Sequence, residues 1–153
     1  MEKKFGRLET MNWLTFALAT IVFYSLMDFF IKISSDKIHS GLGGFIINFV
    51  STIVLLIFLL YSKLQGEKVL ETKPGGLLYS TLAGASIGFA TIFFIKMFAT
   101  GTNLSIGVPL VRIGIVLLAS MLGIVLLKEG VSLKYLLGFL LSLVGLYLLI
   151  TSR

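Results

Sequence analysis

The sequence contains no cysteine, a single histidine and only two prolines among its 153 residues. Without cysteine the chain has no disulfide bond, no thiolate ligand for zinc and no cysteine nucleophile. One histidine, His39, is too few to build a metal site, so we expect no metal and no other cofactor. Charged residues are also scarce, at 13% of the chain, compared with about 25% in soluble domains.

Apolar residues are abundant instead: 57% of the chain is hydrophobic and the mean hydropathy is +1.03. This composition excludes an ordinary soluble enzyme and also a disordered chain. The net charge of +6 forms no continuous basic stripe, so we expect no nucleic acid partner. The basic residues instead lie in short clusters between long uncharged runs, which is typical of loops that face anionic lipid. The expected surroundings of the chain are therefore a lipid bilayer.

Uncharged stretches of about 20 residues recur along the chain, and this is the length that an α-helix needs to cross the hydrocarbon core. They lack the two-residue alternation of strands in a membrane barrel. The expected fold is therefore all-α, a polytopic bundle of five transmembrane helices in a single membrane domain, residues 1–153. These helices are expected near residues 12–33, 42–62, 76–99, 105–127 and 133–151.

The distribution of basic residues predicts the orientation, because Lys and Arg accumulate in cytoplasmic loops. Only Lys37 and Arg153 fall on one side of the expected bundle. Eight fall on the other: Lys3, Lys4, Arg7, Lys63, Lys68, Lys73, Lys128 and Lys134. We therefore expect a multi-pass protein of the cell membrane, with its amino terminus in the cytoplasm and its carboxyl terminus outside.

Asp28, Lys32, Lys96 and Arg112 lie within or at the edges of these spans, where ionisable groups are costly and often functional. Counting from the outer ends of the first and fourth spans places Asp28 and Arg112 at similar depths, roughly 9–11 Å below the outer surface. We expect both to line a water-accessible cavity, with Lys96 at its rim and Tyr24 extending the Asp28 face inward. The four charges sum to a positive value, which would favour an anionic group on a substrate.

Each of these residues has a structural interpretation as well. Asp28 and Lys32 are four residues apart and could form an interfacial ion pair, and both lysines could snorkel to the surface. Asn48 in the second span either binds substrate or makes an interhelical hydrogen bond. Pro109 either kinks the fourth helix near Arg112 or simply lies in its first turns.

Small residues at helical spacing predict places where another helix approaches closely, within one chain or between chains. Gly84 and Gly88 form such a pair in the third span, and Gly138 and Gly145 share a face in the fifth. We expect these four glycines to serve in helix packing or in dimerisation.

Several motifs together resemble a known family. They are Asp28-Phe-Phe-Ile-Lys32 late in the first span, Gly101–Pro109 at the start of the fourth, Leu126-Leu-Lys-Glu129 at its end, and Gly138 with Gly145 in the last. This progression is similar to the EamA-like repeat of the drug/metabolite transporter superfamily, over nearly the whole chain. The last helix also resembles the glycine-spaced dimerisation helix of the small multidrug resistance family.

Most members of that superfamily contain two five-helix repeats of opposite orientation, or pair shorter chains. The resemblance therefore implies a functional unit of two chains with a central substrate cavity and alternating access. It also implies that Glu129 is a structural residue at a helix end. The first span has no glutamate at its middle, which argues against proton-coupled cation antiport. The uneven basic charge leaves three alternatives open. The dimer is parallel, or a five-helix partner of opposite orientation exists, or the sequence context overrides the charge bias and both orientations of this chain occur.

The expected function is secondary transport of a small metabolite or drug by a homodimer. Anionic substrates are among those expected. Two alternatives are a subunit of a lipid-linked phosphate flippase and a membrane scaffold that transports nothing. We do not expect an enzyme, because the sequence has no plausible catalytic triad, metal cluster or phosphate-binding loop.

Overall fold

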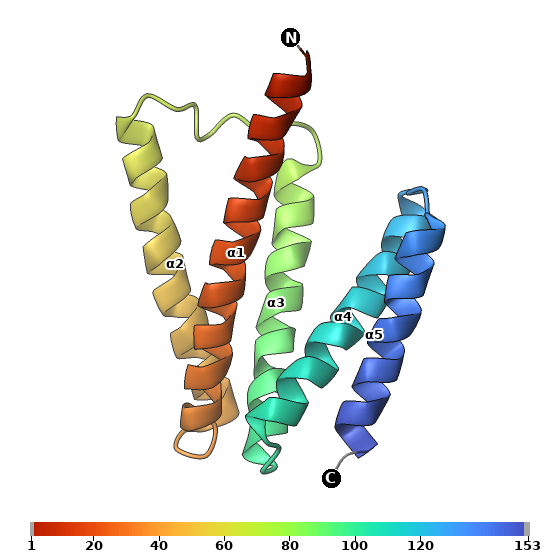
Figure 1. The fold of residues 1–153 in the computed structure, drawn as a ribbon. Coiled ribbons are helices and arrows are strands. Elements are labelled where there is room, and N and C mark those ends of the chain that lie inside the picture. The colour runs from red at the N-terminus through yellow and green to blue at the C-terminus, as the bar shows by residue number, and fades with distance from the viewer. Residues whose placement is uncertain (1, 152–153) are drawn as a thin grey trace. The chain divides into compact units, whose positions relative to one another are not determined.

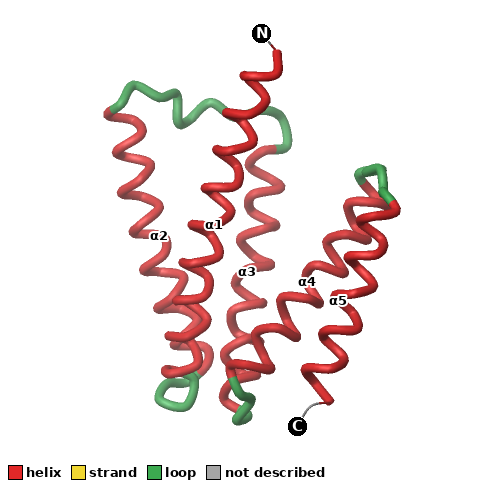
Figure 2. Tube along the Cα trace, in the orientation of Figure 1, coloured by secondary structure: helices red, strands yellow, loops and turns green. Residues whose placement is uncertain are grey.

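The computed structural model describes residues 2–151, and within that range it consists of five α-helices and no β-strand. Figures 1 and 2 show the helices and the short loops that join them. The all-α prediction is confirmed, and the four later helices begin and end within two residues of their predicted bounds. Arg153, counted above on the outer side, lies outside the described residues. The helices are α1 (Glu2–Ser34), α2 (Ser40–Leu64), α3 (Gly76–Ala99), α4 (Leu104–Leu126) and α5 (Leu133–Thr151).

Four helices contain apolar segments long enough to cross a membrane: Trp13–Ser34, Ser40–Leu64, Gly76–Ala99 and Leu104–Leu126. Most of their large apolar side chains are exposed, and the buried apolar core among the described residues is limited to Ile31, Ile95 and Phe98. Exposure of such a large apolar surface to water is unfavourable, whereas the hydrocarbon of a bilayer solvates it readily. The protein is therefore a multi-pass membrane protein.

Helix α5 is shorter than the other four. Its 19 residues span about 28 Å at 1.5 Å per residue, close to the roughly 30 Å of a hydrocarbon core. The apolar segment described within it, Leu133–Leu148, is below the length of the four long spans. A fifth crossing by α5 stays a prediction.

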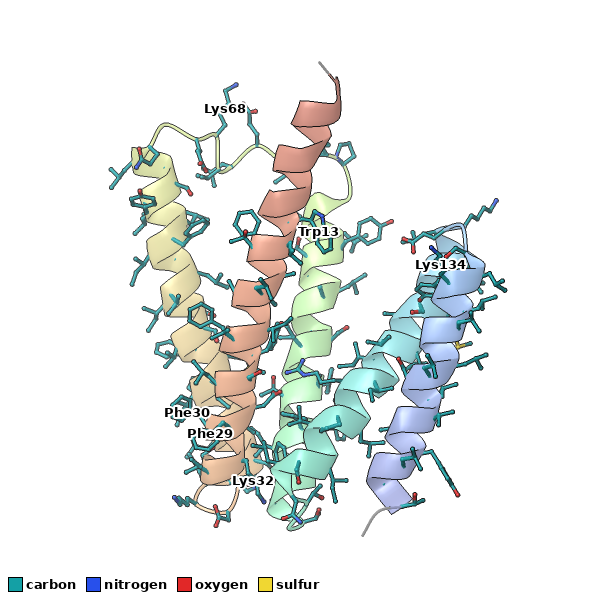
Figure 3. All side chains as sticks on the ribbon, in the orientation of Figure 1. Trp13, Phe29, Phe30, Lys32, Lys68 and Lys134 are labelled. Atoms are coloured by element: carbon teal, nitrogen blue, oxygen red, sulfur yellow. The ribbon has the colours of Figure 1, made fainter. Side chains whose placement is uncertain are left out.

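The chain divides into two compact units, Met1–Thr100 with α1 to α3 and Gly101–Arg153 with α4 and α5. In the first unit α3 packs against both α1 and α2. Within this unit successive helices run in opposite directions, so α1 and α3 point the same way and α2 is antiparallel to them (Figure 1). Trp13 and Lys68 lie toward one end of this unit and Lys32 at the other (Figure 3).

Local contacts define the start of α2. The backbone N–H of Gly41 donates a hydrogen bond to Nδ1 of His39, with a separation of 3.2 Å. His39 is therefore the N-cap of this helix, where a side-chain acceptor satisfies an otherwise free backbone donor. The next loop, between α2 and α3, turns at Gly75 directly before α3. The φ of Gly75 is +83°, a conformation that favours glycine.

The second unit is a helical hairpin in which α4 packs against α5. The carbonyl of Gly123 accepts hydrogen bonds from the N–H groups of Leu127 and Glu129, each 3.1 Å long. Between them Lys128 adopts a left-handed φ of 55°, which reverses the chain after α4. The Tyr135 hydroxyl of α5 donates to the Ser120 hydroxyl of α4 and ties the two helices together.

Candidate functional site

Asp28 is 3% exposed and lies in the best-buried part of the first unit. It shares a face of α1 with Ile31 and Ser35, which are also buried, and the buried residues of the neighbouring α3 are Ile95 and Phe98. Asp28 is six residues from the end of α1, a distance of about 9 Å along the helix. An acidic side chain shielded at this depth in a membrane protein marks a candidate functional site.

Lys32 of α1 contacts an aromatic ring of α3. Its Nζ lies 5.5 Å from the centroid of the Phe98 ring, in cation–π geometry. An ion pair between Lys32 and Asp28 stays a prediction. Figure 3 shows Lys32 at the α1 end that leads into the first loop. The lysine chain extends toward the ring and the helix end, whereas the shorter Asp28 side chain stays within the buried face.

Tyr24 and Lys96 lie at the margins of this buried region. Tyr24 precedes Asp28 by one helical turn and is 42% exposed. Lys96 is exposed and directly follows the buried Ile95. One residue corresponds to a rotation of about 100° around a helix, so Lys96 emerges from α3 well away from the buried face. Its place at the rim of a cavity stays a prediction.

Asn48 lies in a groove between α2 and α3. Its Nδ2 donates a 2.8 Å hydrogen bond to the carbonyl of Gly44, one turn earlier in the same helix. The groove has a volume of about 450 Å³, and its lining includes Gly84 and Gly88 of α3. The structure therefore groups Asn48 with the predicted glycine pair of α3.

Arg112 belongs to the second unit, where it is partly buried on α4. It follows the start of α4 at Leu104 by eight residues, which is about 12 Å along the helix axis. Pro109 lies inside α4, just under one turn before Arg112. Because proline has no N–H, the carbonyl of Ser105 lacks its helical donor at this point.

Two glycines of α2 lie close to side chains of α3, whereas the role of the four predicted glycines in packing or dimerisation stays a prediction. A Cβ placed on Gly43 would lie 3.5 Å from Cδ1 of Ile95, and one on Gly44 would lie 3.5 Å from Cγ1 of Ile92. These two glycines therefore let α2 approach α3, although sequence reasoning did not single them out for packing. Among the described residues, by contrast, a Cβ would meet no atom within 4 Å at any of the four predicted positions: Gly84, Gly88, Gly138 and Gly145.

Glu129 folds back over the last turns of α4. Its Oε2 lies 2.5 Å from the position that a Cβ on Gly123 would occupy. Its backbone N–H also donates to the Gly123 carbonyl. This arrangement agrees with the structural role at a helix end that the resemblance implied.

Comparison with known proteins adds one finding. Residues 11–151 match the EamA-like transporter family, a range that includes apolar segments of all five helices. Neither the curated proteins nor the solved structures gave a match to this chain. The family consists of membrane transporters of small molecules, and the long apolar helices fit that assignment. The chain therefore belongs to the EamA-like transporter family.

Proposed function

We propose that this protein is a secondary transporter of a small metabolite or drug that carries an anionic group. The observation that carries the proposal is the burial of Asp28, 3% exposed, in a chain whose other surfaces are overwhelmingly apolar. A carboxylate in such surroundings is costly, and it persists where it serves a substrate or ion pathway. Membership of a transporter family supports the same interpretation.

Arg112 is the proposed anion receptor. Counted along its own helix from the end that we expect outside, Asp28 lies at about 9 Å and Arg112 at about 12 Å. Arginine recognises carboxylate and phosphate groups through two parallel hydrogen bonds. A substrate anion would therefore bind to Arg112. Tyr24, one turn from Asp28, would contact the remainder of the substrate.

The unit of transport proposed here is a pair of chains. Each chain contributes one five-helix repeat, and a central cavity between two repeats would open alternately to the two sides. Both units of the chain would belong to one transport domain, with the amino terminus in the cytoplasm and the carboxyl terminus outside. The basic residues on the cytoplasmic side support this orientation. The proposed activity is transport and not catalysis.

The test begins with the thermal midpoint of the purified protein in the presence of organic carboxylates, phosphate esters and amines. Solutes that stabilise the protein are then offered to proteoliposomes as radiolabelled substrates. We expect stabilisation by an anionic solute and saturable uptake, both lost in Arg112→Gln. Asp28→Asn should retain anion binding, because it removes a carboxylate and leaves the arginine in place. Lys63→Gln, at the cytoplasmic end of α2, is the matched control and should behave like wild type.

Four results would contradict the proposal. Stabilisation by amines alone would remove the anion assignment, and uptake unchanged in Arg112→Gln would remove the proposed receptor. A protein stabilised only by phosphate-headgroup lipids, with no uptake of soluble solutes, would be a flippase subunit. A protein that neither binds nor transports any member of the panel would fit the scaffold alternative.

A further inference from the structure

The loop between α2 and α3 turns aside as soon as α2 ends. The N–H of Glu67 donates a 3.1 Å hydrogen bond to the carbonyl of Ser62, and Gly66 between them adopts a left-handed φ of +86°. Together these features form a Schellman turn, which ends a helix and redirects the chain. Figure 2 shows the loop crossing the end of the first unit from α2 to α3. The loop therefore runs across the helix ends instead of continuing along the axis of α2.

Exposed tyrosines lie at both ends of this loop. The Tyr61 hydroxyl, in the last turn of α2, accepts a 2.9 Å hydrogen bond from Nε2 of Gln65. Tyr79 lies three residues after the start of α3 at Gly76. Tyrosine is enriched at the level of the lipid headgroups, where its ring meets apolar chains and its hydroxyl meets water. This pattern indicates that both ends of the loop lie at headgroup level, within reach of lipid.

The middle of the loop is a turn with an apolar tip. The N–H of Glu71 donates a 3.1 Å hydrogen bond to the carbonyl of Lys68, and the two side chains form an ion pair of 2.9 Å. Figure 3 shows Lys68 extending away from the helices. Val69 and Leu70 form the tip, and Leu70 is 78% exposed. Turns in water usually carry Gly, Asn, Asp, Ser or Pro, so a Val–Leu tip at headgroup level favours contact with lipid.

We propose that this loop lies on the bilayer surface, with Leu70 inserted among the acyl chains and Lys63 and Lys73 bound to phosphate groups of anionic phospholipids. Insertion removes the leucine side chain from water, which is favourable. Lys63 lies in the last turn of α2 and Lys73 lies three residues after Leu70, so a lysine flanks the apolar tip on each side. The leaflet is the one that we expect to face the cytoplasm, where anionic lipids are abundant. The proposal depends on the membrane assignment and not on transport.

Fluorescence can locate Leu70, because Trp13 is the only tryptophan in the sequence. Leu70→Trp in a Trp13→Phe background is placed in vesicles of phosphatidylcholine and phosphatidylglycerol whose acyl chains carry bromine, a contact quencher. Lys68→Trp, at the base of the same turn, is the matched control. We expect strong quenching at position 70 and little at position 68, and Val69→Trp reports the tip if Leu70→Trp folds poorly. Equal quenching at positions 70 and 68, or no quenching at the tip, would overturn the proposed insertion.

Lipid composition tests the lysines. In the Leu70→Trp background, Lys73→Gln is expected to lower the ratio of inserted to free loop about fivefold in the anionic vesicles and to change nothing in pure phosphatidylcholine. Lys37→Gln, the same substitution in the loop at the other end of the unit, should leave quenching unchanged. High salt should also weaken insertion of the unsubstituted loop. Quenching that does not depend on anionic lipid, or that Lys73→Gln and Lys37→Gln reduce equally, would overturn the proposed lipid contact.

Discussion

The contact between Gly123 and Glu129 allows a quantitative test of how the end of α4 is built. An alanine at position 123 would place its Cβ 2.5 Å from Oε2 and 3.1 Å from Cδ of Glu129. Neither distance is compatible with van der Waals contact, so the carboxylate must move away. Gly123→Ala is therefore expected to disturb the chain reversal after α4, even though it adds one methyl group only.

The expected size of the effect follows from two opposing terms. Overpacking a close contact costs about 1–3 kcal/mol, while alanine gains about 1 kcal/mol over glycine in a helix interior. We expect Gly123→Ala to lower the free energy of unfolding by about 1 kcal/mol. Gly114→Ala is the matched control on the same helix, because a Cβ there meets no described atom within 4 Å. It should be neutral or stabilising by up to about 1 kcal/mol.

The assay is reversible unfolding in mixed micelles by SDS, followed by circular dichroism. A double-mutant cycle with Glu129→Ala isolates the contact, because removing the carboxylate should remove the cost of the methyl group. The reasoning would be refuted if Gly123→Ala were as stable as Gly114→Ala. It would also be refuted if the cost of Gly123→Ala were the same in the Glu129→Ala background.

The same unfolding assay tests three further contacts. Lys128→Gly should raise the free energy of unfolding by about 1 kcal/mol, because glycine adopts the left-handed conformation without steric cost; a decrease would contradict this. His39→Leu should lower it by about 1 kcal/mol through loss of the helix cap, whereas His39→Asn should retain most of the stability; equal losses would show that the cap does not matter. Tyr135→Phe should cost about 1 kcal/mol, and adding Ser120→Ala should cost little more, since both remove the same hydrogen bond; additive losses would argue against that bond.

Hydropathy was sufficient to predict the helices, because spanning segments must be long and uncharged wherever they occur. The exception is the start of α1, predicted near residue 12 and found at Glu2. The helix extends beyond its apolar span, Trp13–Ser34, and hydropathy predicts only that span. The polar residues before that span contain no proline, and nothing in them stops a helix from continuing.

The candidate site was only partly predictable. The depth of Asp28 follows from counting residues along one helix, a local property. Its burial depends on the packing of α1 against α3, where Ile95 and Phe98 lie nearly 70 residues away in sequence. The contact between Lys32 and Phe98 has the same origin. Periodicity shows which residues share a face, but it does not show which helix covers that face.

The glycines illustrate the same limit. The four-residue spacing of Gly84 and Gly88 identified a face that permits close approach, yet the close contacts of α2 with α3 are made by Gly43 and Gly44. Adjacent glycines lack the helical spacing that was used as the signal. Their role became visible only once the position of Ile92 and Ile95 was known.

The central claim is a chain that crosses the bilayer five times with its amino terminus in the cytoplasm. Labelling single cysteines with a membrane-impermeant maleimide in intact cells tests it most directly. Asp36→Cys, in the first loop, and Thr151→Cys, at the end of α5, should react from outside. Gln65→Cys, in the α2–α3 loop, should react only after the membrane is opened. Labelling of Thr151→Cys and Gln65→Cys from the same side would contradict the account.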